Sequence, residues 1–424
     1  MFQAPPAGLP GLFLHVYLPF AGAYFLSYLY RTVNAVVGPL IVADLGLSAG
    51  ELGLLSSAYF VMFSAVQLPL GIALDRFGPR RVQSTLLLVA ALGAILFGFG
   101  DSMTELVIGR MLIGLGVAAG LMGSLKIITL WVPAHQWALV NGLLMAAGGL
   151  GSLMATAPSQ AALTVMTWHG LFFWLSGITI GVATIVWLIV PEKPAQAATG
   201  TLAEQIKAIG RIVRDGYFWR IVPAFTFQQA SFIGMQTLWI GPWLRDVAGQ
   251  DAATRAQTML ITAIGMTAGF LTSGMASALL RRVGITNAMT VTASLVLFML
   301  CSVALAVASL GIAVGIPHAV LWCAFAFLGT YSILYFPLLT AAFPVELSGR
   351  VTTSGNFIMF STVFLAQWGI GRVLDFWPRT ATGGYAAEGY AISFAVLIVL
   401  QLLAMIWQAL SRARPMTDHA PHAA

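Results

Sequence analysis

The stretch Gly71-Ile72-Ala73-Leu74-Asp75-Arg76-Phe77-Gly78-Pro79-Arg80-Arg81 interrupts a long apolar part of the chain. It holds four charged residues and two glycines, whereas the runs on either side, 51–74 and 81–100, are almost entirely apolar. Each run is long enough for a helix that crosses a bilayer, because spanning the hydrocarbon core takes about 20 apolar residues. The stretch is therefore predicted to be a short basic loop between two membrane-spanning helices.

The composition of the whole chain agrees with a protein that lies mainly in lipid. Of its 424 residues, 59% are hydrophobic and only 8% are charged, whereas soluble proteins carry about 25% charged residues. The net charge of +6 is spread over many loops and does not form the basic patch that nucleic-acid binding needs. The two cysteines, Cys301 and Cys323, lie in apolar runs and are predicted to be reduced packing residues. The six histidines show no metal-ligand spacing, so no metal or other cofactor is expected.

Twelve segments are apolar enough and long enough to span a bilayer. They are 13–42, 51–74, 81–100, 105–132, 136–163, 170–190, 217–245, 256–280, 285–309, 317–343, 351–375 and 386–410. Only the polar stretch from Pro191 to Gly216 is a long gap, and it divides the segments into six and six. The prediction is an all-α membrane protein with twelve transmembrane helices.

The lysines and arginines predict the orientation of these helices. If both termini are cytoplasmic, thirteen of the 20 basic residues lie on the cytoplasmic side, four lie on the opposite side and three lie within spans. Cytoplasmic loops of membrane proteins carry this kind of positive excess. We therefore expect a multi-pass protein of the bacterial inner membrane with both termini in the cytoplasm.

The two halves repeat each other's landmarks. Gly38-Pro39 in the first span corresponds to Gly241-Pro242 in the seventh, and loop 71–78 corresponds to 277–284. Such repeats are typical of transporters whose substrate site lies between two pseudo-symmetric halves. The predicted division is an N-terminal six-helix bundle (1–190), a cytoplasmic linker (191–216), a C-terminal six-helix bundle (217–411) and a cytoplasmic tail (412–424).

The linker has a helical pattern of its own. Leu202, Ile206, Ile209 and Val213 recur at helical spacing, with basic residues on the other faces. The pattern predicts a short amphipathic helix that lies on the cytoplasmic membrane surface. An unstructured linker is the alternative.

The loop at 71–81 resembles the G-x-x-x-D-[RK]-x-G-[RK]-[RK] signature between helices 2 and 3 of the major facilitator superfamily. The segment 109–116, Gly-Arg-Met-Leu-Ile-Gly-Leu-Gly, is similar to the second motif of that family. The resemblance covers nearly the whole chain and implies alternating access, with a cytoplasmic latch between helices 2 and 11 that breaks when that side opens. The alternative is that these arginines only set the topology. The implied gating residues are Gly71, Asp75, Arg76, Gly78, Arg80, Arg81 and Arg110.

Three cations, Arg31, Arg110 and Lys126, lie within expected spans, whereas none of the 14 acidic residues lies in the middle of one. A charge at the centre of a bilayer costs about 3 kcal/mol or more, so it usually faces a wet cavity and serves a function there. Snorkelling to the cytoplasmic surface is the alternative for Lys126, which lies in the inner third of its span. For Arg110, near the outer end, a structural or gating role is expected.

Arg31 belongs to a polar face of the first span. Tyr24 and Tyr28 precede it on the same face, and Asn34 flanks that stripe. The segment 27–34 resembles the first helix of the superfamily's organic-anion transporters, in which the arginine lies in the substrate cavity. Tyr30 stands where those proteins have an aspartate, so the resemblance implies no proton-coupling acid at this position.

Further polar side chains share helix faces in the second half. Gln229 and Gln236 lie on one face of the seventh span, and Tyr331 and Tyr335 lie on one face of the tenth. Hydrogen bonds between helices are the alternative for each pair. The candidate substrate-binding residues are Arg31, Lys126, Tyr28, Asn34, Gln229, Gln236, Tyr331 and Tyr335.

Together these features predict a secondary active transporter and not an enzyme, since no nucleophile–base motif occurs. Cations without carboxylates in the spans favour a small organic anion, above all a carboxylate, as the cargo of a symporter or exchanger. A coupled proton is the candidate second solute. The alternatives are an efflux pump for drugs or other neutral or anionic compounds and a membrane sensor that transports nothing. A monomer in the lipid bilayer is expected, without nucleic acid.

Overall fold

The computed structural model describes residues 11–133, 136–191, 202–344, 347–381, 383–413 and 415–416. In these ranges the ordered elements are all helices. The first half consists of η1 (Phe13–Tyr17), α2 (Leu18–Thr32), α3 (Asn34–Leu45), α4 (Ala49–Phe77), α5 (Pro79–Phe99), α6 (Met103–Val117), α7 (Ala119–Trp131), α8 (Trp137–Met154), α9 (Ala157–Ala162) and α10 (Trp168–Ile189).

A linker helix and the second half follow. They consist of α11 (Leu202–Val213), α12 (Gly216–Gly234), η3 (Met235–Trp239), α13 (Ile240–Asp246), α14 (Ala252–Arg282), α15 (Asn287–Ser309), α16 (His318–Thr330), η4 (Tyr331–Leu334), α17 (Tyr335–Ala341), α18 (Ser348–Leu374) and α19 (Ala387–Leu410).

The helices have the lengths and composition of membrane spans. In the described part of the chain, ten helices are long and apolar enough to cross a bilayer, and the bent pair Phe13–Thr32 and Asn34–Leu45 makes an eleventh candidate. The remaining expected span, 217–245, is the unbroken helical run α12–η3–α13, whose glutamines make it more polar than the others. The prediction of an all-α membrane protein is confirmed.

Local sequence signals explain where the helices begin and end around the charged loop. Ser48 and Glu51 form a capping box that starts α4, because each satisfies a free backbone N–H of the first turn. Gly78 ends α4 with φ of +81°, a conformation that residues with a Cβ rarely adopt. Pro79 then starts α5, where its missing N–H costs nothing. Gly78 and Pro79 thus produce a tight reversal at the predicted place, but residues 71–77, which the sequence analysis assigns to the loop, are the last two turns of α4.

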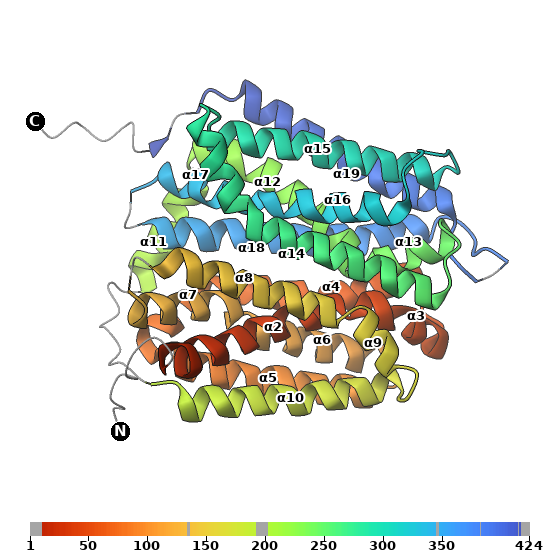
Figure 1. The fold of residues 1–424 in the computed structure, drawn as a ribbon, viewed down its shortest axis with the longest axis horizontal. Coiled ribbons are helices and arrows are strands. Elements are labelled where there is room, and N and C mark those ends of the chain that lie inside the picture. Colours follow the sequence, from red (N-terminus) through yellow and green to blue (C-terminus); the bar gives the residue numbers. More distant parts are fainter. Residues whose placement is uncertain are drawn as a thin grey trace, which may run out of the picture.

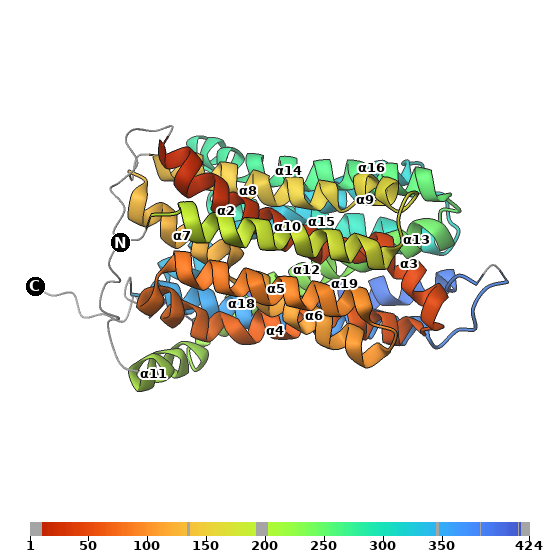
Figure 2. The same cartoon turned by 90° about the horizontal axis from the view of Figure 1, so that it is seen from below.

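The axes of the long helices are roughly aligned, and the first half of the chain lies next to the second half (Figures 1 and 2). Two helix pairs, α4 with α18 and α8 with α14, form the seam between the halves. Small residues allow this close approach: a Cβ at Gly53 would lie 2.9 Å from the backbone oxygen of Gln367, and one at Gly149 would lie 2.3 Å from the hydroxyl of Thr267. The seam brings α2, α4, α12 and α18 around the centre of the molecule.

The linker is helical over α11, which lies apart from the main body in Figure 2. Ala208 and Ile212 are buried against the rest of the protein, while Lys207, Arg211 and Arg214 are exposed. The side chains of 202–206, including the first two residues of the apolar pattern, are outside the described residues. Contact of this helix with the membrane surface remains a prediction.

Candidate functional site

A cavity of about 620 Å³ lies between the two halves. The first half contributes residues of α2, α4, α7 and α8, and the second half contributes residues of α12, η3, α14, η4 and α18. Its polar lining consists of Tyr24, Ser27, Tyr28, Arg31, Gln67, Asn141, Gln229, Gln236, Thr237, Ser273, Thr330, Ser332, Thr352 and Asn356. The remaining lining is apolar or glycine, so the cavity combines a few polar groups with large hydrophobic walls.

Arg31 is the basic residue of this lining. It lies one residue before the end of α2, and only 8% of it is exposed. Its guanidinium carbon lies 4.7 Å from the ring centre of Tyr28, 5.2 Å from that of Phe63 and 5.3 Å from that of Phe360. Aromatic faces stabilise a cation without neutralising it.

The lining offers Arg31 no counter-ion. It contains no Asp or Glu among its described residues, and the Nε atom of Arg31 is buried without a hydrogen-bond partner. A buried charge that is not paired is costly, so in a resting protein it normally finds a partner. A positive charge therefore faces a cavity that contains no protein anion.

Three other predicted residues share this cavity with Arg31. Tyr28 packs its ring against the guanidinium, and Gln229 lines the opposite half with a buried Oε1 atom that has no hydrogen-bond partner. Gln236 lines it as well, and its Nε2 atom donates to the Ser152 hydroxyl at 3.4 Å. The sequence patterns therefore identified residues of both halves that line the same cavity.

The other four predicted ligands lie outside the lining. Asn34 is fully buried and donates to the Ser56 hydroxyl at 3.0 Å. Tyr335 donates to Gln408 at 3.4 Å, and the Tyr331 hydroxyl lies 3.5 Å from that of Thr272. These three side chains do not line the cavity because each contacts a polar side chain of another helix. Such hydrogen bonds between helices are the alternative that the sequence analysis gives for the tyrosine pair.

Lys126, the fourth of these residues, binds a carboxylate instead of lining the cavity. Its Nζ atom donates to Asp75 Oδ1 at 2.8 Å, and the two side chains are 34% and 47% exposed. Lys126 is thus half-exposed near the end of α7, as the snorkelling alternative predicts. Its charge is already paired with that of Asp75. The pair joins α7 to α4 within the first half. A latch from Asp75 to α18 remains a prediction.

The structure also shows where the other predicted gating residues lie. Arg76 lies over the ring of Phe77, and Arg80 lies over that of Trp187, each at 5.4 Å. Arg81 is exposed in the first turn of α5, and a Cβ at Gly71 would meet open space. Their part in gating remains a prediction.

Arg110 differs from all of these because it is only 1% exposed. Its Nη1 atom donates to the backbone oxygen of Tyr30 at 2.9 Å, and its guanidinium lies 5.2 Å from the ring centre of Phe97. This bond joins α6 to α2 next to Arg31, at a place outside the cavity lining. The geometry is that of a structural bridge between helices, which fits the structural or gating role expected from the sequence.

Two amides of the cavity were missed by the sequence analysis. Gln67 of α4 is 2% exposed, and its Oε1 atom has no hydrogen-bond partner; the same holds for the Oδ1 atom of Asn141 in α8. Both line the cavity. The available signal was the one that selected Gln229, namely an amide within an otherwise apolar span.

The ends of the helices that are expected to face outward are closed. Asp375 follows α18 and accepts from the backbone N–H groups of Ala49 and Gly50 at 2.9 and 2.8 Å, so the second half caps α4 of the first. Arg379 donates to the backbone oxygen of Leu47. A Cβ at Gly371 would lie 2.3 Å from the backbone oxygen of Ala49, so no larger residue fits at this crossing.

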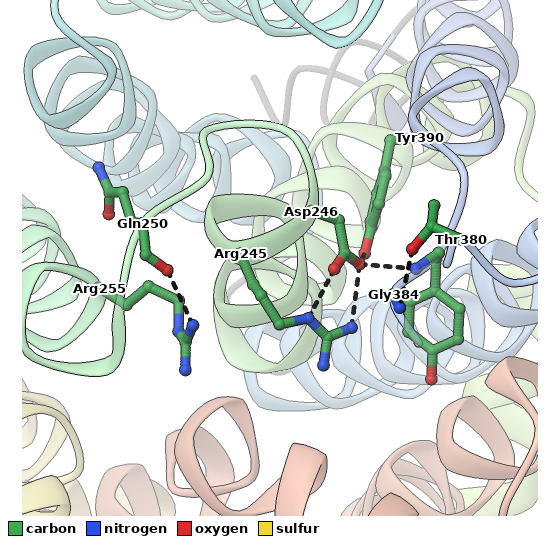
Figure 3. Close-up of polar contacts among 8 residues, drawn as sticks. Arg245, Asp246, Gln250, Arg255, Thr380, Gly384 and Tyr390 are labelled. Carbon is green, nitrogen blue, oxygen red and sulfur yellow. Dashed lines mark hydrogen bonds and ion pairs between the residues drawn. The ribbon is translucent and has the colours of Figure 1, made fainter. Parts of the chain in front are cut away.

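The same closed end contains a buried carboxylate, Asp246 (Figure 3). Its side chain is 2% exposed and forms an ion pair with Arg245 at 2.5 Å. The Tyr390 hydroxyl and the Tyr385 N–H also donate to it, at 2.9 and 3.0 Å. This acid therefore ties α13 to the loop before α19 and to α19 itself, and its bonding capacity is used within the second half.

At the opposite end the cavity reaches exposed positions. Its lining includes Met275, which is 61% exposed, and Leu271, which is 42% exposed. Both belong to the second half of α14, on the side of the loop at 78 and the expected cytoplasmic surface. The cavity therefore extends from the centre of the molecule toward the end opposite the contact of Asp375 with α4.

The chain is similar to proteins of known family. The sequence model of the Major Facilitator Superfamily matches residues 20–367. A relative named "Probable sulfoacetate transporter SauU" from Cupriavidus necator is 24% identical over 260 residues, which cover 58% of this chain and 60% of that protein. The "Probable L-galactonate transporter" of Escherichia coli is 32% identical over 163 residues, which cover 38% of this chain and 35% of that protein. The chain thus spans at most 60% of the length of either relative.

Solved structures show the same fold over most of the chain. A bacterial homolog of the human lysosomal transporter Spinster, in an inward-facing and unoccupied conformation, has a TM-score of 0.72 at 18% identity, over 95% of this chain and 97% of its own. A D-xylose–proton symporter has a TM-score of 0.69 at 17% identity, over 91% and 96%. The family model covers most of the chain, and the relatives and solved structures named here are transporters. The protein therefore belongs to the Major Facilitator Superfamily.

Proposed function

We propose that this protein is a secondary active transporter that moves a small organic anion, in particular a carboxylate, across the bacterial inner membrane by alternating access. The observation that carries the proposal is the buried guanidinium of Arg31, which faces the cavity between the halves without an acidic partner. The rest of the lining is neutral, so the empty cavity carries one uncompensated positive charge. An anionic substrate supplies the missing partner.

The position of Arg31 suits a site that alternates between two sides. It lies at the end of α2, where the chain bends by 43° into α3, and beside the seam of the two halves. A ligand bound to Arg31 from the first half and to Gln229 or Asn356 from the second would contact both moving parts. Such bridging lets substrate binding change the relative stability of the two conformations.

The relatives agree with this class of substrate. They include proteins named as probable transporters of sulfoacetate, of L-galactonate and of galactarate or D-glucarate. These compounds are dianions or polyhydroxylated acids, so the relatives support an organic anion as the class of substrate and do not support a particular charge or shape. Among the residues that the structure describes, the lining has no carboxylate to carry a proton. If transport is coupled to protons, they travel on the substrate or through acids near the surfaces, such as Asp75 and Glu51.

Uptake into proteoliposomes tests the proposal. We expect accumulation of at least one labelled anion from a panel of benzoate, lactate, gluconate and succinate, and a loss of at least tenfold in apparent affinity for Arg31→Gln. Such a loss corresponds to about 1.4 kcal/mol, less than a charge-assisted hydrogen bond contributes. The matched control is Arg282→Gln, an exposed arginine at the end of α14 away from the cavity, which should transport normally. Equal uptake by wild type and Arg31→Gln for every anion would refute the role of Arg31.

The apolar walls favour one second candidate, the export of hydrophobic compounds. Large side chains such as Phe232, Phe270 and Met359 line most of the cavity. Energised everted vesicles with a neutral lipophilic dye in the medium distinguish the two functions, because an exporter would accumulate the dye in their lumen. An exporter would transport the dye equally in wild type and Arg31→Gln, whereas the anion transporter would leave the dye at its passive distribution.

A further inference from the structure

The number of cations that face the cavity limits the charge of its ligand. Three basic residues lie within the expected spans, and the structure places each in a different environment. Lys126 is paired with Asp75 at 2.8 Å, and Arg110 donates to the Tyr30 carbonyl, at a place outside the lining. Arg31 is therefore the single Lys or Arg among the described residues that line the cavity. One unneutralised positive charge remains for a substrate.

The aromatic surroundings of Arg31 do not alter this charge. The rings of Tyr28, Tyr59, Phe60, Phe63 and Phe360 lie within 6.0 Å of its guanidinium carbon. They replace some of the solvation that the cation loses on burial, and they contribute no net charge. They also surround the place where the acid group of a ligand would pair with the guanidinium. The neighbourhood of the charged group is consequently hydrophobic.

The walls farther from Arg31 are hydrophobic too. Met122, Met145, Met266, Met275 and Met359 all line the cavity. Methionine side chains are flexible and polarisable, so they adapt to apolar ligands of different shape. Hydroxyl groups of a ligand find unpaired acceptors in the lining at a few amides, among them Gln67, Asn141 and Gln229. The hydroxyl groups of a sugar acid that lie against the apolar side chains would stay without hydrogen bonds, and each unmade bond costs binding free energy.

We propose that the substrate is a monoanionic organic acid with a hydrophobic body, a carboxylate or sulfonate that carries one charge, and that dianions and polyhydroxylated acids are excluded. This inference rests on the proposed function, because it assigns Arg31 to the acid group of the substrate. Its physical basis is the match between one cation and one anion. A second carboxylate would lose its hydration against apolar side chains and gain no counter-ion in return.

Binding to the purified full-length protein tests this with four ligands that separate charge from shape. Benzoate is the monoanion with an aromatic body, benzamide is its neutral counterpart, terephthalate carries a second charge on the far side of the ring, and gluconate is a polyhydroxylated monoanion. Carboxylic acids of this kind are ionised at neutral pH. Isothermal titration at pH 7.5 should give the tightest binding for benzoate, at least tenfold tighter than for each of the other three.

Two variants make the test specific to the cavity. Arg31→Gln should remove the preference for benzoate over benzamide. Gln229→Lys adds a second cation to the wall of the other half, and it should raise the affinity for terephthalate relative to benzoate at least tenfold. Thermal unfolding of both variants without ligand establishes that they are folded.

The possible results separate the two proposals. Binding of benzamide as tight as that of benzoate would overturn the anion proposal itself. If the anions bind through Arg31 but terephthalate or gluconate binds as tightly as benzoate, the transporter of organic anions stands and the monoanion inference is overturned. An unchanged ratio of terephthalate to benzoate affinity in Gln229→Lys would also contradict the charge match.

Discussion

At the scale of the residue, three cations of similar sequence context have three different environments. Arg31 is held by aromatic rings and faces the cavity. Arg110 is buried outside the cavity and donates a hydrogen bond to a backbone oxygen, and Lys126 forms a half-exposed ion pair with Asp75. A charge in a membrane protein is therefore a sign of function only when its partner is missing, and Arg31 is the residue that meets this condition here.

The pair of Lys126 and Asp75 gives a prediction at this scale. Lys126→Gln should change the apparent affinity for the transported anion less than threefold, because the lysine is outside the cavity lining and its charge is already paired. Exposed ion pairs contribute about 0–1 kcal/mol, so the melting temperature should move little. The measurement is proteoliposome uptake, with Arg31→Gln as the positive control. A tenfold loss of affinity in Lys126→Gln, without a similar loss in Asp75→Asn, would show that the lysine binds substrate directly.

At the scale of the helix, the crossing of α4 and α18 joins the two halves at the closed end. Glycines at both sides let the helices touch, and the carboxylate of Asp375 caps the free N–H groups at the start of α4. The residues of this contact come from opposite halves of the chain. In the proposed alternating-access mechanism this contact breaks when that end opens, so it would add to the stability of the conformation seen here.

Removal of this cap should shift the conformational equilibrium. Asp375→Ala deletes two charge-assisted hydrogen bonds and is expected to weaken the closed end by about 1–3 kcal/mol. Spin labels at Thr104 and Ala253, exposed positions at this end of the two halves, would report a larger population of long distances in a background without Cys301 and Cys323. Glu388→Ala removes an exposed acid of the same end and serves as the control. Identical distance distributions for wild type and Asp375→Ala would contradict the proposed role.

At the scale of the whole molecule, the cavity extends from the centre toward one end, the end of the loop at 78. The predicted orientation makes that end cytoplasmic, since the positive excess of the loops lies there. In the proposed alternating-access mechanism, a state that gives access from one side is closed on the other, and the contact of Asp375 with α4 would be that closure here.

Cysteine labelling tests the orientation. Met275 lines the cavity in the second half of α14 and is 61% exposed, and Val165 is 81% exposed in the connection between α9 and α10 at the other end. In a variant without Cys301 and Cys323, a membrane-impermeant maleimide should label Met275→Cys in inside-out vesicles, and it should label Val165→Cys in right-side-out vesicles. The reverse pattern would place the termini outside and invert the topology.

The sequence by itself determined the helices, the reversal at the charged loop and the family. It also identified Arg31, Gln229 and Gln236 as residues that line the cavity. These properties depend on hydropathy, capping and local backbone conformation, which neighbouring residues specify. It also limited the candidates for a charged site to three cations, since buried charges are rare enough to stand out.

The tertiary structure alone decided which of these residues meet. Lys126 finds its acid 51 positions away in the chain, and Gly50 finds its cap 325 positions away. Gln67 and Asn141 became part of the cavity, and Asn34, Tyr331 and Tyr335 became helix contacts, because the rotation of each packed helix determines which face points inward. Helix rotation is set by packing against distant segments, and a hydropathy pattern in which most faces are apolar does not encode it.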